Sequence, residues 1–225
     1  MNENNNMHIV VVGSLNMDLV VRIPVIPKPG ETLLGGNFMT FPGGKGANQA
    51  VAAARLGGKV SMVGMVGADA FGTQLKQILK DEGIDVTHTL VSPKEATGVA
   101  LIEVDVQGNN SIAVASGANY ALTKTDVEQA LNAMAHFDLL VMPLETPIDV
   151  VTEAAKIAKK RNARVILNPA PAQILPADLL ENIDVIVPNE HETYYLTGTK
   201  LDNDGDYQKA TAELVSKGIK NVILT

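Results

Sequence analysis

The stretch Phe41-Pro42-Gly43-Gly44-Lys45-Gly46-Ala47-Asn48-Gln49-Ala50 places glycines and a lysine directly before a run of strong helix formers. That run continues to Leu56, and Gly57-Gly58 follows it as a natural stop. We therefore predict a helix over 47–56, with residues 43–46 at its N-terminus. The first turn of a helix has unpaired N–H groups, and glycine lets a ligand approach the backbone. The stretch is predicted to cradle hydroxyl groups or an anion.

Two common phosphate-binding motifs do not match this stretch. A P-loop has Ser or Thr after its lysine, whereas Gly46 follows Lys45 here. A dinucleotide fingerprint that begins at Gly44 needs glycine at position 49, which is Gln49. Taken alone, the stretch is equally compatible with a tight loop that carries a solvated lysine.

The composition favours an α/β fold in one large domain, or in one and a half domains. The chain has 225 residues, of which 46% are hydrophobic and only 4% aromatic, and it has no Trp. Its core must therefore consist of Val, Ile, Leu, Ala and Met, which is typical of parallel sheets.

Charge and cysteine content exclude several classes of partner and chemistry. The net charge is −7 and no run of Lys or Arg forms a basic patch, which argues against nucleic acid or an anionic membrane as partner. Without cysteine there is no disulfide, thiolate nucleophile or Cys-based metal site. Residues 1–7 form a predicted disordered tip without a basic region, and the apolar run at 8–12 is too short for a signal sequence. We predict a cytoplasmic protein that binds a small molecule.

Polar residues follow the first predicted strand, which runs over 9–12 and ends at Gly13. In open α/β sheets, ligands bind beyond the carboxyl ends of the strands. Asn16 and Asp18 lie there, and in an extended segment two residues apart they face the same way. Asp18 is therefore predicted to accept hydrogen bonds from hydroxyl groups, with a loop cap as the alternative.

Strands and helices then alternate along the chain, which predicts a doubly wound, mostly parallel sheet flanked by helices. The further strands are predicted at 60–66, 139–142, 164–167, 184–187 and 222–225. Glu145, Asn168 and Asn189 each follow the end of one of these strands. The polar residues should gather at one edge of the sheet.

Two β-rich segments interrupt this alternation. Residues 32–39 suggest a strand pair or a bulged strand, and residues 99–106 and 111–114 flank the turn residues Gly108 and Asn109. We predict a small β-sheet outside the main one, with strands from about 19–41 and 97–115, that serves as a lid or a dimer contact.

The predicted last strand ends the chain at Thr225. A doubly wound sheet has a helix after such a strand. We therefore expect the complete protein to continue beyond this residue.

Five motifs, in this order and at these intervals, resemble those of the ribokinase-like family of sugar and nucleoside kinases. They are Gly13-Ser14-Leu15-Asn16-Met17-Asp18, Gly43-Gly44-Lys45-Gly46-Ala47-Asn48, Leu144-Glu145, Asn168-Pro169-Ala170-Pro171-Ala172 and Pro188-Asn189-Glu190-His191-Glu192. The resemblance spans residues 8–225 and implies a ribokinase-like α/β domain there, C-terminally incomplete.

The resemblance implies ATP-dependent transfer of the γ-phosphoryl group to the 5-hydroxyl of ribose. It also implies Mg²⁺, activation by a monovalent cation such as K⁺, and a homodimer formed through the β-sheet lid. The residues that it places at the sugar are Asn16, Asp18, Gly43, Gly44, Lys45, Asn48 and Glu145. It places Asn189 and Thr225 near the nucleotide, and Glu192 with Asn189 at an indirect magnesium site. We expect His191 to face solvent.

One departure from the family pattern affects catalysis. The family's Gly-Ala-Gly-Asp supplies the catalytic base and an anion hole, but no Gly-x-Gly-Asp occurs in this sequence. We expect the full-length protein to be a kinase and the 225 residues alone to be inactive. The alternatives are a kinase of another sugar or a nucleoside, and a sugar-binding protein without chemistry. A nicotinamide oxidoreductase is disfavoured because the dinucleotide fingerprint is absent.

Overall fold

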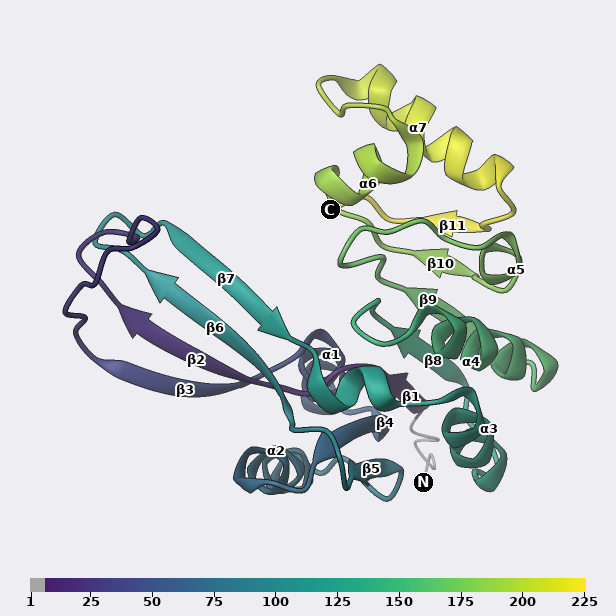
Figure 1. Ribbon diagram of the computed structural model, residues 1–225. Coiled ribbons are helices and arrows are strands. Elements are labelled where there is room, and N and C mark those ends of the chain that lie inside the picture. Colours follow the sequence, from purple (N-terminus) through teal and green to yellow (C-terminus); the bar gives the residue numbers. More distant parts are fainter. Residues whose placement is uncertain (1–6) are drawn as a thin grey trace.

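A computed structural model describes residues 7–225, so residues 1–6 of the predicted disordered tip lie outside the described part. The main body is a seven-stranded sheet in which every neighbouring pair is parallel (Figure 1). Its order is β11-β10-β9-β8-β1-β4-β5. The strands are β1 (His8–Val12), β4 (Lys59–Gly67), β5 (Thr89–Ser92), β8 (Leu139–Met142), β9 (Arg164–Leu167), β10 (Val185–Ile186) and β11 (Asn221–Val222).

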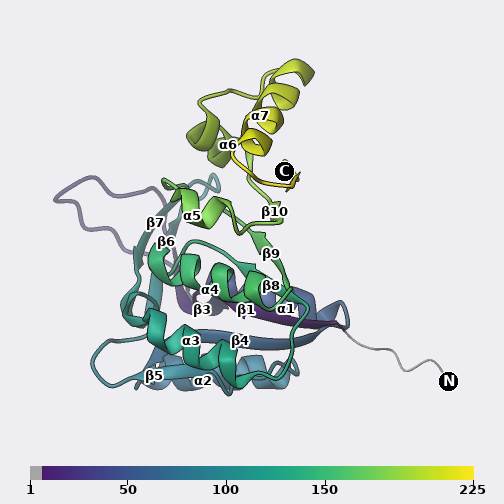
Figure 2. The ribbon, with the colours of Figure 1, turned by 90° about the vertical axis from the view of Figure 1, so that its right-hand side faces the viewer.

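Helices cover both faces of this sheet, and Figure 2 shows α3 and α4 in front of the strands. The helices are α1 (Lys45–Arg55), α2 (Ala70–Asp81), α3 (Lys124–Ala133), α4 (Ile148–Lys160), α5 (Ala177–Leu180), α6 (Glu190–Thr197), α7 (Asp204–Ser216) and the 3₁₀ helix η1 (Gly117–Ala121). Side chains alternate across a strand, so Val11 packs with the α1 and α2 side while Val10 and Val12 pack with the α3 and α4 side. The predicted doubly wound fold is confirmed.

The order of the strands reverses at β1. The chain passes from β1 to β4 on one side, whereas β8 pairs with β1 on the other. In open α/β sheets, this arrangement leaves a crevice between the carboxyl ends of the two strands, where ligands bind.

A second, four-stranded mixed sheet projects from this body (Figure 1). Its order is β3 (Phe38–Gly43), β2 (Asn16–Arg22), β6 (Gly98–Val104) and β7 (Asn110–Ala115). The β2–β6 pair is parallel and the other two pairs are antiparallel. Strands β2 and β3 lie between β1 and α1 in the chain. The small sheet is therefore attached to the main body at the crevice beside β1.

Two local predictions differ from the structure. Strand β5 was not predicted, because its four residues include two polar ones, and its place is fixed by pairing with β4 and by Thr89, which donates to the Met62 carbonyl. The predicted strand over 32–39 begins only at Phe38. Before it, Leu34 is 92% exposed, so this segment has no apolar surface to pack against.

Helix α3 begins with a capping box, in which the Thr123 hydroxyl accepts from the Asp126 N–H and the Asp126 carboxylate accepts from the Thr123 N–H. Among the described residues, no helix is long and apolar enough to cross a membrane.

Candidate functional site

The crevice beside β1 is held together by one carboxylate. Glu145, just after β8, accepts through Oε2 from the Ser14 hydroxyl (2.5 Å) and from the Lys45 backbone N–H (2.9 Å). Its Oε1 lies 3.4 Å from Lys45 Nζ. Helix α1 has no side-chain cap of its own, so Glu145 satisfies its first N–H and opposes the positive end of the helix. Three distant segments therefore meet at this side chain.

The glycines of the cradle bring α1 against the end of β1. The Gly46 N–H donates to the Ser14 hydroxyl at 3.2 Å, and a Cβ at Gly46 would lie 2.5 Å from the Ser14 nitrogen. Gly44 adopts a φ of +90°, a backbone conformation that residues with a side chain rarely adopt. These two glycines are needed for close packing of backbone, whatever ligand approaches them.

Asp18 lies over the cradle on β2, where a Cβ at Gly43 would collide with its carboxylate. It is partly buried, and burial raises its pKa above the usual value. The negative charge of Glu145 raises this pKa further, and Lys45 lowers it. A partly desolvated carboxylate beside an ammonium group is suited to accept hydrogen bonds from hydroxyl groups.

Asn16 lies two residues earlier on the same face of β2 and is 4% exposed. Its Oδ1 accepts from Asn119 Nδ2 at 2.7 Å. Sequence reasoning missed both Asn119 and Ser14 as site residues. Ser14 lay inside a motif that was used, but nothing local indicated that its hydroxyl bridges Glu145 and α1.

A cavity of about 370 Å³ extends from α1 toward α6. It is lined by Lys45, Asn48, Gln49, Asn168, Ala170, Asn189, Glu192 and Thr225. It thus joins residues predicted at the sugar to those predicted at the nucleotide, whereas Asn16, Asp18 and Glu145 lie outside its wall. Gln49 Oε1 and Asn168 Oδ1 are buried without a hydrogen-bond partner among the described residues.

The far end of this cavity is built by a local motif. Glu192 accepts from the Asn189 N–H (2.9 Å) and donates its own N–H to Asn189 Oδ1 (2.8 Å), which forms the capping box of α6. The Thr225 hydroxyl donates to the Pro188 carbonyl at 3.4 Å. His191 is exposed.

Within residues 7–225, no group of three or more His, Cys, Asp or Glu side chains is placed to hold a metal ion. Mg²⁺ is commonly bound through one or two carboxylates, with water and phosphate oxygens in the other positions. The single carboxylate of Glu192 fits that mode of binding. It does not fit a metal site in which protein side chains supply all the ligands.

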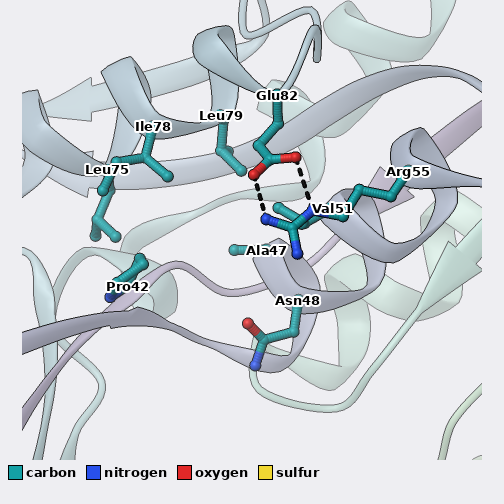
Figure 3. Close-up of a pocket in the computed structure, with 9 residues that line it drawn as sticks. All are labelled: Pro42, Ala47, Asn48, Val51, Arg55, Leu75, Ile78, Leu79 and Glu82. Carbon is teal, nitrogen blue, oxygen red and sulfur yellow. Dashed lines mark hydrogen bonds and ion pairs between the residues drawn. The ribbon is translucent and has the colours of Figure 1, made fainter.

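A second pocket, of about 230 Å³, lies between α1 and α2 on the other side of the cradle helix (Figure 3). Leu75, Ile78 and Leu79 form its apolar wall, and the Arg55–Glu82 ion pair lies beside it (Figure 3). Asn48 contributes to both this pocket and the larger cavity. The larger cavity is the better candidate for chemistry, because its wall carries the polar side chains of Lys45, Asn168 and Glu192.

Comparison with known proteins gives consistent matches. The model of the pfkB family carbohydrate kinases matches residues 6–225. A ribokinase of Haemophilus influenzae is 48% identical over 217 residues, which are 96% of this chain and 71% of that protein. A deoxyribokinase of Salmonella typhimurium is 40% identical over 97% of this chain and 72% of its own length. The structure of Arabidopsis thaliana ribokinase complexed with ribose and ATP superposes with a TM-score of 0.88 at 32% identity, covering 97% of this chain and 72% of that one.

Proposed function

The chain belongs to the pfkB family of carbohydrate kinases, and we propose that its crevice binds D-ribose for transfer of the γ-phosphoryl group of ATP to the 5-hydroxyl. The observation that carries this proposal is the meeting of Asp18, Lys45 and the glycine-rich start of α1 at the reversal of strand order. A polyhydroxylated ligand needs both acceptors and donors, and this site offers both. Relatives named ribokinase support the choice of sugar.

We assign the roles at the sugar from the hydrogen bonds. Asp18 accepts from sugar hydroxyls, while Lys45 and Asn48 donate to sugar oxygens. Glu145 already accepts from Ser14 and Lys45, so its main task is to fix the start of α1 and the position of the lysine. Gly43 and Gly44 let the ligand approach the backbone.

We place the phosphates of ATP at the other end of the cavity, beside Asn189 and Thr225. The capping box uses Oε2 of Glu192, which leaves its second oxygen for a water of Mg²⁺. When bound there, Mg²⁺ would supply positive charge that offsets the charge of the phosphate oxygens. Activation by K⁺ stays a prediction, which a comparison of K⁺ with choline in the kinase assay tests. The use of ATP also supports a cytoplasmic location.

We further propose that the 225 residues bind ribose but transfer phosphate poorly. No Gly-x-Gly-Asp occurs among them, and phosphoryl transfer needs a base that orients the attacking hydroxyl. Asp18 is unsuited to this role, because we propose that other hydroxyls of the sugar already occupy it.

The small sheet is proposed to pair two copies of the chain. Large apolar side chains stand exposed on both of its faces, with Phe38 (63%) and Leu101 (52%) on one face and Ile112 (54%) on the other. Burying such a surface favours association. Light scattering should give the mass of a dimer, and a monomer at high concentration would contradict the pairing.

Titration calorimetry with ribose, followed by an ADP-release assay, tests the main proposal. We expect ribose to bind the wild-type chain, Asp18→Ala to weaken binding about 10- to 100-fold, and ADP release to be slow. Equal affinity of wild type and variant would remove Asp18 from the site. Ribose binding with no ADP release at all would instead indicate a sugar-binding protein without kinase activity.

The Salmonella deoxyribokinase favours one second candidate, a kinase of 2-deoxyribose. A site that hydrogen-bonds the 2-hydroxyl rejects the sugar that lacks it, because its own polar groups are left unpaired. Equal affinity for the two sugars would favour the deoxyribose activity. Fructose and adenosine in the same titration test another sugar or a nucleoside as substrate.

A further inference from the structure

Asn119 is the most completely bonded side chain beside the crevice, although no role for it followed from the sequence. It lies in η1, directly after the small sheet, and is 1% exposed. Both ends of its amide are bonded to other groups of the protein, so any effect of Asn119 on a ligand acts through Asn16. It lies where the small sheet joins the main body, and it is hydrogen-bonded to Asn16 at the start of β2.

The backbone fixes the orientation of the Asn119 amide. Oδ1 accepts from the Leu15 N–H at 2.9 Å, while the carbonyls of Ser116 (3.0 Å) and Leu15 (3.2 Å) lie within hydrogen-bond distance of Nδ2, whose two hydrogens serve these carbonyls and Asn16. A flipped amide would place its oxygen against two carbonyl oxygens and its nitrogen against an N–H. Nδ2 must therefore be the atom that faces Asn16.

This orientation decides which end of the Asn16 amide is free. Asn119 Nδ2 donates to Asn16 Oδ1 at 2.7 Å, so the oxygen of Asn16 is occupied. Nδ2 of Asn16 has no hydrogen-bond acceptor within the part of the chain that the structure describes. Asn16 is thus left with donors to offer to a ligand on the face of β2 that carries Asp18.

Gly98 makes room for this pair. It lies opposite Asn16 in the β2–β6 pairing, and a Cβ there would collide with both Asn16 Oδ1 and Asn119 Nδ2. The hydrogen bond between Asn16 on β2 and Asn119 in η1 therefore depends on the absence of a side chain at Gly98 on β6.

We propose that Asn119 is a positioning residue that fixes the Asn16 amide so that it donates to a sugar hydroxyl oxygen. The proposal rests on the proposed function, in which Asn16 contacts the sugar. A sugar hydroxyl can both donate and accept a hydrogen bond. On β2, Asp18 then accepts from the sugar hydroxyls and Asn16 donates to them, so the two side chains together satisfy both functions.

A double-mutant cycle on the 225-residue chain tests the link between the two asparagines. Loss of one hydrogen bond predicts that Asn119→Ala weakens ribose affinity about three- to tenfold in calorimetry. In an Asn16→Ala background, Asn119→Ala should cause no further loss. Full additivity of the two losses, or unchanged affinity in folded Asn119→Ala, would overturn the proposal.

Two further variants separate positioning from general stability. Thr89 is as deeply buried as Asn119, but it lies on β5 at the edge of the main sheet, where its hydroxyl donates to the Met62 carbonyl. Thr89→Val removes this hydrogen bond, so the variant should have a lower unfolding temperature and unchanged ribose affinity. Gly98→Ala should weaken ribose binding through steric pressure on the pair, even if Asn119→Ala does not fold. Wild-type affinity in folded Gly98→Ala would count against the proposal.

A sugar-independent measurement distinguishes failure of this inference from failure of the proposed function. The ¹⁵N order parameter of the Asn16 side-chain amide should be high in the wild type and fall in Asn119→Ala. An unchanged order parameter would refute positioning by Asn119, whatever the ligand. If ribose does not bind the wild type while this order parameter does fall, the proposed sugar is wrong and the positioning role stands.

Discussion

The two ends of the crevice are built in different ways. At the sugar end, hydrogen bonds join residues far apart in the sequence, with separations of 131 for Ser14–Glu145, 104 for Leu15–Asn119 and 100 for Lys45–Glu145. At the nucleotide end, the capping box joins Asn189 and Glu192, only three residues apart.

This difference has a consequence for function. The local motif can form wherever α6 forms, whereas the sugar end requires the strands β1, β2 and β8 and helix α1 to be in place. Changes to these long-range contacts at the sugar end should therefore alter ribose binding together with the fold, and changes to the capping box at the nucleotide end should stay local.

The largest expected effect is that of Gly46→Ala. The added Cβ would meet backbone atoms of Gly13 and Ser14 within 2.8 Å, so α1 must move away from β1. We expect ribose binding to fall at least about 100-fold and thermal stability to fall with it, because well-packed backbone leaves no room to adjust. Gly198→Ala at the end of α6 is the control, since its Cβ meets nothing within 4 Å and only its φ of +70° is strained. Ribose affinity within tenfold of wild type in Gly46→Ala would break the contrast between the two ends.

Asp18→Asn should separate binding from stability. The pKa of Asp18 is raised in the folded protein by burial and by Glu145, so the folded state binds the proton more tightly than the unfolded state. Stability is therefore lost as pH rises through this raised pKa, and removal of the charge should raise the unfolding temperature at neutral pH.

The same variant should weaken ribose affinity about 10- to 100-fold, because hydrogen bonds to charged groups are lost. In the wild type, ribose binding should weaken as pH falls through the raised pKa, and calorimetry over a range of pH measures this. A variant that is less stable than wild type at neutral pH would show that the charge of Asp18 is stabilising, contrary to the shift of its pKa.

Ser14→Ala is a milder test of the sugar end. It removes the hydroxyl that links Glu145 to Gly46 but leaves Glu145 bonded to Lys45, so we expect about a fivefold loss of ribose affinity. Ser216→Ala removes an exposed hydroxyl that donates to the Glu213 carbonyl at the end of α7, far from the crevice in the sequence, and it should leave ribose affinity unchanged. Equal behaviour of the two serine variants in calorimetry would mean that the bridge does not matter.

The smallest effect is expected for Asn189→Ala. Loss of this N-cap should cost about 1 kcal/mol and lower the unfolding temperature by about 2–4 °C. Nucleotide affinity should fall a few-fold while ribose affinity stays the same. Asn203→Ala removes the cap of α7, away from the cavity, and should reproduce only the loss of stability. A loss of ribose affinity in Asn189→Ala would show that the two ends are not independent.

The same contrast explains what could be predicted from the sequence. The parallel fold follows from apolar runs that alternate with helical segments, and the Asn189–Glu192 pair is visible because both partners fall within four residues of sequence. The cradle at Gly43–Gly46 was visible as glycines at a helix start. Each of these signals is local.

The remaining contacts could not be predicted, because their partners are distant. Nothing near Ser14 indicates Glu145 as the acceptor of its hydroxyl, and nothing near Asn119 indicates that its amide orients Asn16. Strand β5 was missed for the same reason, since its position depends on β4 and on the bond from Thr89 to Met62.

The bond between Ser14 and Glu145 also bears on how the protein is made. Ribosomes add about 5–20 residues per second, so the 131 residues between these partners take about 7 to 26 s to synthesise. Throughout that time β1, which becomes a central strand, has no neighbour on the side that β8 later occupies. An open strand edge of this kind pairs readily with other chains. The growing polypeptide should therefore be most prone to aggregation, and most dependent on chaperones, before β8 emerges.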